Sequence, residues 1–433
     1  MKLFVLTALS FSLLGAAEMP PAGGVIDLPT ALRLAGANNL DVQIAREKVA
    51  EARAAGEAAR DKFLPWITPS IVVRRHENNI QAVNGPILDV NKQSLSAGLT
   101  LTAQIDLGET YYQNLVARQT VRAQEAAMAG RAREATLRAA TAYFELLRIR
   151  AAVIAAEEAT RVTSSYAEQI GVTADAGLTF IGDVARARGA RERAELATVR
   201  LRTEQRIAAA RLAEFLHLDP VVELTPVESD LAPLKLVEAG GEIGALISRA
   251  LAARPELDEA GARLAGARIA RKGATYGPLI PTLGAQAALG GLGGPSGSSL
   301  TCDFDSSTDY AIGLSWRVGP GGIFDRNRQR ETAARERQGE LELEKVRDLI
   351  RRQVVEQHAR FRSLAAQIDL ARKALEAADQ TARLSRQRRE TGVGAVFEDL
   401  QAEEELARAR RDYASTVADY NLAQYALRFA TGE

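Results

Sequence analysis

The chain has 433 residues, and its 55 basic and 55 acidic side chains leave no formal net charge. This balance argues against a nucleic-acid-binding protein, because neutralising phosphates takes a surplus of Lys and Arg. The 46% hydrophobic and 25% charged content argues against both a disordered chain and a polytopic helical membrane protein. Aromatic residues are only 5%, so we expect a core of small and aliphatic side chains, which suits closely packed long helices.

The N-terminal segment has the pattern of a secretory signal. Lys2 precedes a mostly apolar run, Leu3 to Leu14, and the small residues Gly15, Ala16 and Ala17 follow it. We expect residues 1–17 to be removed on export; the alternative is a short buried helix. No later run is apolar over the roughly 18 residues of a spanning helix, so a membrane crossing would have to use strands.

The two halves of the chain repeat one plan. Gly98 and Gly313 stand in matching contexts, as do Gly177 and Gly392, and both pairs are 215 positions apart (313 − 98 and 392 − 177). This spacing indicates a tandem duplication. Pro and Gly residues gather between the halves and mark a linker. The predicted organisation is a first repeat 18–218, a connecting segment 219–242 and a second repeat 243–433.

Each repeat contains a segment of alternating apolar and polar residues. The apolar positions in the first repeat are Leu95, Ala97, Leu99, Leu101, Ala103 and Ile105, and in the second Tyr310, Ile312, Leu314, Trp316 and Val318. A period of two predicts strands, and their length is that of an outer-membrane strand. A weaker strand precedes each one, so we predict hairpins over 66–105 and 282–318. Half-buried strands of a water-soluble domain are the alternative.

Long helical patterns follow each hairpin. They cover 108–176 and 325–391 without a strong breaker, and the apolar residues Ala139, Ala142 and Leu146 begin a heptad-like seam. Such a seam predicts paired antiparallel helices in coiled-coil packing. Shorter helices are predicted over 183–216 and 398–430, and an opening helix over Leu28 to Lys62.

Several local motifs, in this order and at the 215-residue spacing, resemble the TolC family of bacterial outer-membrane efflux proteins. The motifs are Leu64-Pro65 and Ile280-Pro281, Arg254-Pro255-Glu256-Leu257, Gly319-Pro320-Gly321-Gly322, and Gly392 followed by Glu398-Asp399-Leu400. The resemblance implies a mainly α fold with β-hairpins, in which long antiparallel coiled-coil helices join four strands per chain. It also implies a homotrimer that shares one 12-stranded β-barrel in the outer membrane and extends into the periplasm.

Elementary geometry agrees with a shared barrel. Four strands cannot close a barrel, since the smallest membrane barrels need about eight. Open sheet edges in lipid would expose backbone groups at several kcal/mol each. Several copies must therefore contribute strands if this sheet crosses a membrane.

The resemblance also implies a periplasmic gate beside the second turn glycine. In the family, acidic residues six and nine positions after this glycine ring the tunnel entrance; here these positions are Glu398 and Gln401, with Asp399 between them. Asp183 is the first-half counterpart. Three copies of a carboxylate facing one axis would attract cations. The alternative is that the acids only favour the N-terminal helix dipole. The family's Tyr three residues before the glycine is Arg389 here.

The turns between the helices are the expected contact surface for a periplasmic adaptor, the membrane fusion protein; the alternative is ordinary helix–helix turns. The residues concerned are Gly177, Leu178, Thr179, Phe180, Gly392, Val393 and Gly394.

The sequence therefore predicts a passive export channel of a tripartite efflux or secretion system that joins the adaptor to an inner-membrane transporter. The alternative is a periplasmic coiled-coil scaffold or adhesin. No catalytic residues, cofactor or metal site are predicted. His76, His217 and His358 lie far apart in the plan, and the single cysteine, Cys302, has no partner for a disulfide or redox motif.

Overall fold

The computed structural model describes residues 24–177, 180–228, 231–237, 241–295, 302–391 and 396–433, so the expected signal segment 1–17 lies outside it. The chain divides into two compact units. The first consists of Met1–Ala45, Met128–Pro255 and Asp348–Glu433, and the second of Arg46–Ala127 and Glu256–Arg347. Each unit therefore combines segments from both halves of the sequence. Among the helices of the described ranges, none is long and apolar enough to span a membrane.

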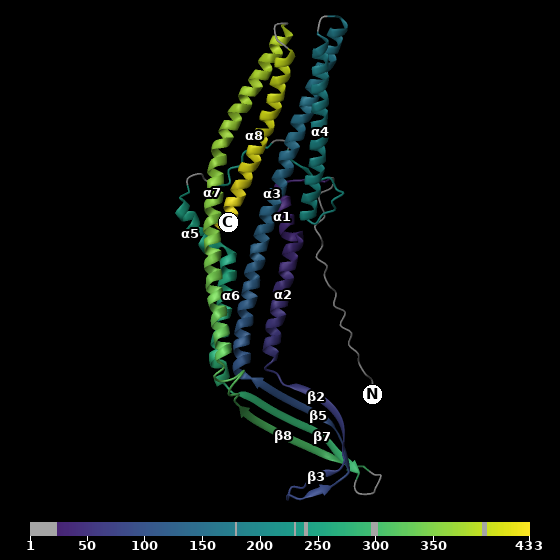
Figure 1. Ribbon diagram of the computed structural model, residues 1–433, viewed down its shortest axis with the longest axis vertical. Helices are drawn as coiled ribbons and strands as arrows, with labels where there is room; N and C mark the ends of the chain where they lie inside the picture. Colours follow the sequence, from purple (N-terminus) through teal and green to yellow (C-terminus); the bar gives the residue numbers. More distant parts are fainter. Residues whose placement is uncertain (1–23, 178–179, 229–230, 238–240, 296–301, 392–395) are drawn as a thin grey trace. The chain divides into compact units, whose positions relative to one another are not determined.

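The second unit contains an antiparallel four-stranded sheet of order β2-β5-β7-β8 (Figure 1). The strands are β2 (Trp66–His76), β5 (Lys92–Asp106), β7 (Thr282–Pro295) and β8 (Cys302–Ser315). The two central strands come from different sequence halves, so the predicted hairpins pair with one another. In the chain segment that connects β2 to β5, the strands β3 (Asn79–Gln81) and β4 (Ile87–Asp89) form a small separate hairpin.

The register gives this sheet one apolar and one polar face. Leu99 is level with Pro69 on β2 and with Leu289 on β7, and Ile71, Leu101, Ile312 and Leu314 belong to the same face by alternation. Most of these side chains are exposed, including Ile71 at 78% and Ile312 at 82%. The opposite face presents mostly Thr, Ser, Gln, Gly, Arg and Asp residues, with Trp66, Val72 and Leu292 as exposed apolar exceptions. A sheet with this much exposed apolar surface needs an apolar environment.

Two glycines allow the halves to join at the centre of the sheet. Gly98 and Gly290 are register partners on β5 and β7. A Cβ atom on Gly98 would lie 2.5 Å from the Leu289 carbonyl oxygen, and one on Gly290 would lie 2.3 Å from the Ala97 carbonyl oxygen. The backbones approach too closely here for a larger residue.

The second unit also contains helical segments that pack through ion pairs. The helices are α2 (Leu40–Asp61), α3 (Leu107–Asp175), α6 (Pro255–Tyr276), the short η1 (Gly277–Leu279) and α7 (Arg326–Glu390). Of these, parts of α2, α3 and α7 and the first residue of α6 belong to the first unit. Arg271 on α6 pairs with Glu336 on α7 at 2.9 Å. Arg328 at the start of α7 pairs with Glu109 at the start of α3. The Arg271–Glu336 pair joins two helices of the second half, and the Arg328–Glu109 pair joins helices from the two sequence halves.

The first unit is helical. It contains α1 (Leu28–Asn38), α4 (Ile181–Phe215), α5 (Ile243–Ala253) and α8 (Val396–Thr431), together with parts of the long helices. Tyr143 and Leu146 of α3 are fully buried against Leu212 and Leu216 at the end of α4. Ala139 and Leu146 of the predicted heptad seam have no exposed surface. The long helices correspond to the ranges 108–176 and 325–391 expected from sequence.

The connecting segment is ordered in part by side-chain amides of α8. Residues Thr225–Pro226 form β6, which pairs in parallel with β1 (Val25–Ile26). The fully buried Gln424 accepts hydrogen bonds from the backbone NH groups of Leu236 and Val237, at 2.7 and 3.2 Å. Its amide NH2 donates to the Leu234 carbonyl oxygen at 2.9 Å. The linker is thereby fixed to the last helix.

Two sequence expectations about element ends were wrong. The opening helix does not run unbroken from Leu28 to Lys62, because Asn39 is extended and its side-chain oxygen accepts from the NH of Asp41 at 3.0 Å, which caps a second helix. The last strand stops at Ser315 and does not reach Val318. Val318 forms an isolated bridge to Ile323, inside a turn that leads to α7.

Candidate functional site

The ends of α3 and α7 and the starts of α4 and α8 come together in the first unit. Arg389, near the end of α7, makes three contacts there. Its Nε lies 2.9 Å from Oδ2 of Asp399 on α8, its Nη1 donates to the side-chain oxygen of Gln169 at 3.1 Å, and its guanidinium lies 4.8 Å from the Tyr166 ring centroid. We call Tyr166, Gln169, Arg389 and Asp399 the turn-end cluster. It connects the α3–α4 pair to the α7–α8 pair.

Tyr166 and Asp399 of the turn-end cluster are buried and Arg389 is partly buried, whereas Gln169 is exposed. The Asp399 side chain is 7% exposed and the Arg389 side chain 24%. Burial, assisted by the nearby Asp399 carboxylate, raises the pKa of Tyr166 to about 12. The phenol is therefore neutral at physiological pH, and its buried oxygen has no hydrogen-bond partner among the described residues. An arginine over a neutral ring and beside a carboxylate is an attractive arrangement in a site with little water.

Glu398, the principal gate residue predicted from sequence, lies beside this cluster. It is half-exposed in the first turn of α8, with its carboxylate 3.5 Å from Arg388. Arg386 pairs in the same way with Glu403, one turn further along α8. Three basic residues at the end of α7 therefore face three acids at the start of α8. Glu398 has both a cation and a helix N-terminus near it, which reduces its negative potential.

The other predicted gate residues differ in environment. Asp399 is turned into the turn-end cluster, whereas Gln401 is exposed. Asp183 lies in the first turn of α4 and pairs with Arg186 at 2.9 Å. The resemblance pointed to Glu398 and Asp399, and Arg389 was noted only as a replacement for the family's tyrosine; the pairing of Arg386, Arg388 and Arg389 with these acids and Glu403 was not expected. The basic run that precedes the turn glycine is the signal that could have found them.

The predicted adaptor-contact turns are only partly described. Leu178, Thr179, Gly392, Val393 and Gly394 lie outside the described residues. Gly177 has a φ of 73°, a left-handed conformation that favours glycine.

Large apolar side chains border both turns. Phe180 is 70% exposed, Ile181 78% and Phe397 54%. A Cβ atom on Gly182 would lie 2.3 Å from the Phe180 ring, so the small residue leaves room for this orientation. Exposed aromatic and aliphatic groups at one place are typical of a protein contact surface.

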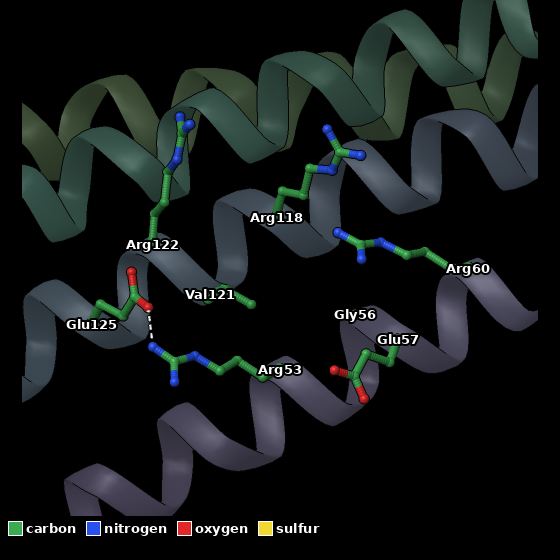
Figure 2. Close-up of a pocket in the computed structure, with 8 residues that line it drawn as sticks. All are labelled: Arg53, Gly56, Glu57, Arg60, Arg118, Val121, Arg122 and Glu125. Atoms are coloured by element: carbon green, nitrogen blue, oxygen red, sulfur yellow. Dashed lines mark hydrogen bonds and ion pairs between the residues drawn. The ribbon is translucent and has the colours of Figure 1, made fainter.

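A basic groove lies between α2 and α3 in the second unit (Figure 2). Its volume is about 350 Å³, and its charged lining residues are Arg53, Glu57, Arg60, Arg118, Arg122 and Glu125. Arg53 pairs with Glu125 at 2.6 Å, across the two helices. Figure 2 shows the Arg60 and Arg118 side chains extending into the same space. Four guanidinium groups against two carboxylates favour anions over cations in this groove.

Histidines and acidic residues of the described ranges do not combine into a metal site. Within them, no three His, Cys, Asp or Glu residues form a group that could hold a metal ion. His76 lies on β2 and His358 on α7, in different units. His217 follows α4 and has a φ of 54°. The side chain of Cys302 is not among those described.

Comparison with known proteins gives a consistent result. The family model described as "Outer membrane efflux protein" matches residues 31–216 and 246–433. Protein CyaE of Bordetella pertussis is 28% identical over 296 residues, which is 67% of this chain and 60% of that protein. The chain thus spans about three fifths of the length of this curated relative.

Solved structures show the same fold. The CmeC outer membrane channel of Campylobacter jejuni superposes with a TM-score of 0.80 at 15% identity, covering 94% of this chain and 85% of that one. A membrane protein from Pseudomonas aeruginosa gives a TM-score of 0.79 at 18% identity, covering 96% and 98%.

Proposed function

The chain belongs to the outer membrane efflux protein family, and we propose that three copies of it form a passive export channel which docks with a periplasmic adaptor and an inner-membrane transporter. The family assignment confirms the predicted resemblance, the outer-membrane location and the prediction that the chain is not an enzyme. It favours a channel over the alternative of a periplasmic scaffold or adhesin.

The observation that carries the proposal is the sheet β2-β5-β7-β8. It has an exposed apolar face, a polar face, and two edges, β2 and β8, that have no strand partner in the described chain. An apolar exterior and a polar interior are what a water-filled membrane barrel requires. Three copies would supply twelve strands and leave no open edge.

The turn-end cluster is proposed as the device that holds the channel closed. Closing a duct requires helix pairs that contact one another in one state and separate in the other. Arg389 contacts Tyr166 and Gln169 across the α3–α4 and α7–α8 pairs, next to the packing of Leu400 on the Tyr166 cluster, and its position is occupied by a tyrosine in the family pattern. In this proposal Glu398 and Asp399 of three copies surround the entrance, with Gln401 and Asp183 nearby, and the Arg388 and Arg389 partners reduce their attraction for cations.

The exposed apolar groups beside the turns are proposed as the adaptor contact. Phe180, Ile181 and Phe397 would be buried by a partner whose docking surface presents complementary apolar groups. The turn residues 177–180 and 392–394 would lie within this interface.

Site-specific photo-cross-linking tests docking. A photoreactive amino acid replaces Phe180 in the full chain, in cells that contain the adaptor and the transporter. We expect a covalent adduct with the adaptor. The matched control is the same replacement at Val199, which is also exposed on α4 but further along the helix. Adducts of equal yield at both positions, or none at Phe180 in a channel that is present in the outer membrane, would contradict the docking proposal.

A further inference from the structure

The two unpaired edges of the four-stranded sheet carry opposite charges on the polar face. Arg74 lies near the end of β2, and Asp305 and Asp309 lie on β8; all three are exposed. The register through β5 and β7 places Arg74 level with position 303 of β8. Positions 305 and 309 are separated from that level by even numbers of residues, so they share the face of Arg74.

These charges do not neutralise one another within a chain. Two strands separate β2 from β8, which places their axes about 14 Å apart at about 4.8 Å per strand. Arg74 and Asp309 have no ion pair among the described residues. Neighbouring Arg75 does have one, with Glu77 at 2.6 Å, but it lies on the other face. Among the described residues neither edge charge has a partner, so both are available to a neighbouring copy.

We propose that β8 of one copy pairs with β2 of the next, and that Arg74 forms an ion pair with Asp309 across this seam. The proposal rests on the shared barrel proposed above and identifies which residues join the copies. The partner is a second copy of this chain, and the argument for it is the charge complementarity of the two edges. Closure by three copies produces three such pairs on the polar face.

The stagger that a barrel requires brings these two residues together. For twelve strands tilted by about 35–45°, with strands about 4.8 Å apart and a rise of about 3.3 Å per residue, the total stagger is about 12–18 residues. Each of the three copies then accounts for about four to six residues of this stagger. A stagger in the wrong direction would move Arg74 past the start of β8.

The strand ends indicate the direction of this stagger. Trp66, the first residue of β2, is level with Ala311 of β8, yet β8 continues past that level to Ser315. At the end of the sheet where the helices attach, β8 thus extends four residues (315 − 311) further than β2. If the next copy continues this step by about four to six residues, its Arg74 lies opposite Ser307 or Asp309. If Arg74 lies opposite Ser307, Asp305 and Asp309 are its diagonal neighbours on the adjacent strand, and both are within reach of an arginine side chain.

Thiol cross-linking tests the register. In a full-length Cys302→Ser background, Arg74→Cys is combined with Asp309→Cys and treated in membranes with a short bifunctional thiol reagent. We expect covalent dimers and trimers on a denaturing gel. The matched control is Thr68→Cys with Asp309→Cys, because Thr68 is level with Asp309 when the stagger is zero. These two β2 sites are about 20 Å apart, so the reagent distinguishes them.

Charge exchange tests the ion pair itself. We expect Arg74→Asp to lower the temperature at which the trimer dissociates, and Arg74→Asp with Asp309→Arg to restore it. Cross-linking of the control pair but not of Arg74→Cys with Asp309→Cys, or no recovery in the charge exchange, would overturn this inference while leaving the channel intact. A wild-type chain that is monomeric in the outer membrane would overturn the proposed function as well.

Discussion

Replacing Arg389 by Met tests the turn-end cluster most sharply. Methionine keeps much of the length and packing of the side chain but removes the charge and the donors. The change abolishes the 2.9 Å ion pair with Asp399, the 3.1 Å hydrogen bond to Gln169 and the contact with the Tyr166 ring. Closure that depends on Arg389 should then weaken.

The expected magnitude follows from burial. Removing one partner of a fully buried ion pair costs about 3–5 kcal/mol. Arg389 is 24% exposed and Asp399 has a further interaction, so we expect the substitution to remove about 2 kcal/mol of stabilisation from the cluster. If all of this stabilises the closed state, the ratio of open to closed channels rises about 30-fold.

Single-channel recording in planar bilayers, with hydrogen exchange of the start of α8, measures this effect. The matched control is Arg383→Met, since Arg383 also lies on α7 but, among the described residues, its ion pair runs along its own helix, with Asp379 at 2.9 Å. We expect more frequent opening and faster exchange in Arg389→Met alone. Equal behaviour of the two variants, or wild-type opening and exchange in Arg389→Met, would refute the reasoning.

Three other predictions concern separate parts of the chain. Glu398→Ala should weaken cation block and raise conductance in planar bilayers; unchanged values would remove Glu398 from the gate. Gln424→Leu should lower the free energy of unfolding by about 2–4 kcal/mol, because the buried NH groups of the linker lose their acceptor, and thermal denaturation followed by circular dichroism would show it. Glu109→Gln should be less stable than wild type at pH 7, with the difference shrinking as the pH falls below about 4.5. Although burial opposes the shift, hydrogen bonds from Arg328 and Gln113 lower the pKa of Glu109, so its stabilisation is complete above the unfolded value and is lost through the lower folded value. A difference in melting temperature that does not change between pH 7 and pH 3 would contradict this.

The strands and long helices were predictable because their signals are local. The alternation around Leu99 and the uninterrupted pattern of 108–176 depend only on the period of apolar residues. The pairing of β5 with β7 brings together positions from the two halves, and it became visible only in the sheet register, at Gly98 and Gly290.

Breaks and partners were harder to predict because they depend on tertiary contacts. Asn39 interrupts the opening helix, and its side chain also donates to the carbonyl oxygen of Phe215, a residue far away in sequence. Arg389 was noticed only as a substitution for the family's tyrosine, since its contact with Tyr166 joins helices from opposite halves. Glu398 and Asp399 were singled out by the family resemblance, through their spacing from Gly392 in the sequence, and their role in a gate stays a prediction.

Conductance of the wild-type chain in planar bilayers tests the central claim most directly. Purified protein that retains its helical circular dichroism signal is added to one side of a lipid bilayer under a constant voltage, without nucleotide. If the chain is a passive channel, we expect discrete, reproducible current steps whose size scales with voltage. Folded protein that inserts into the bilayer and gives no current steps, in the wild type and in Arg389→Met alike, would contradict the account.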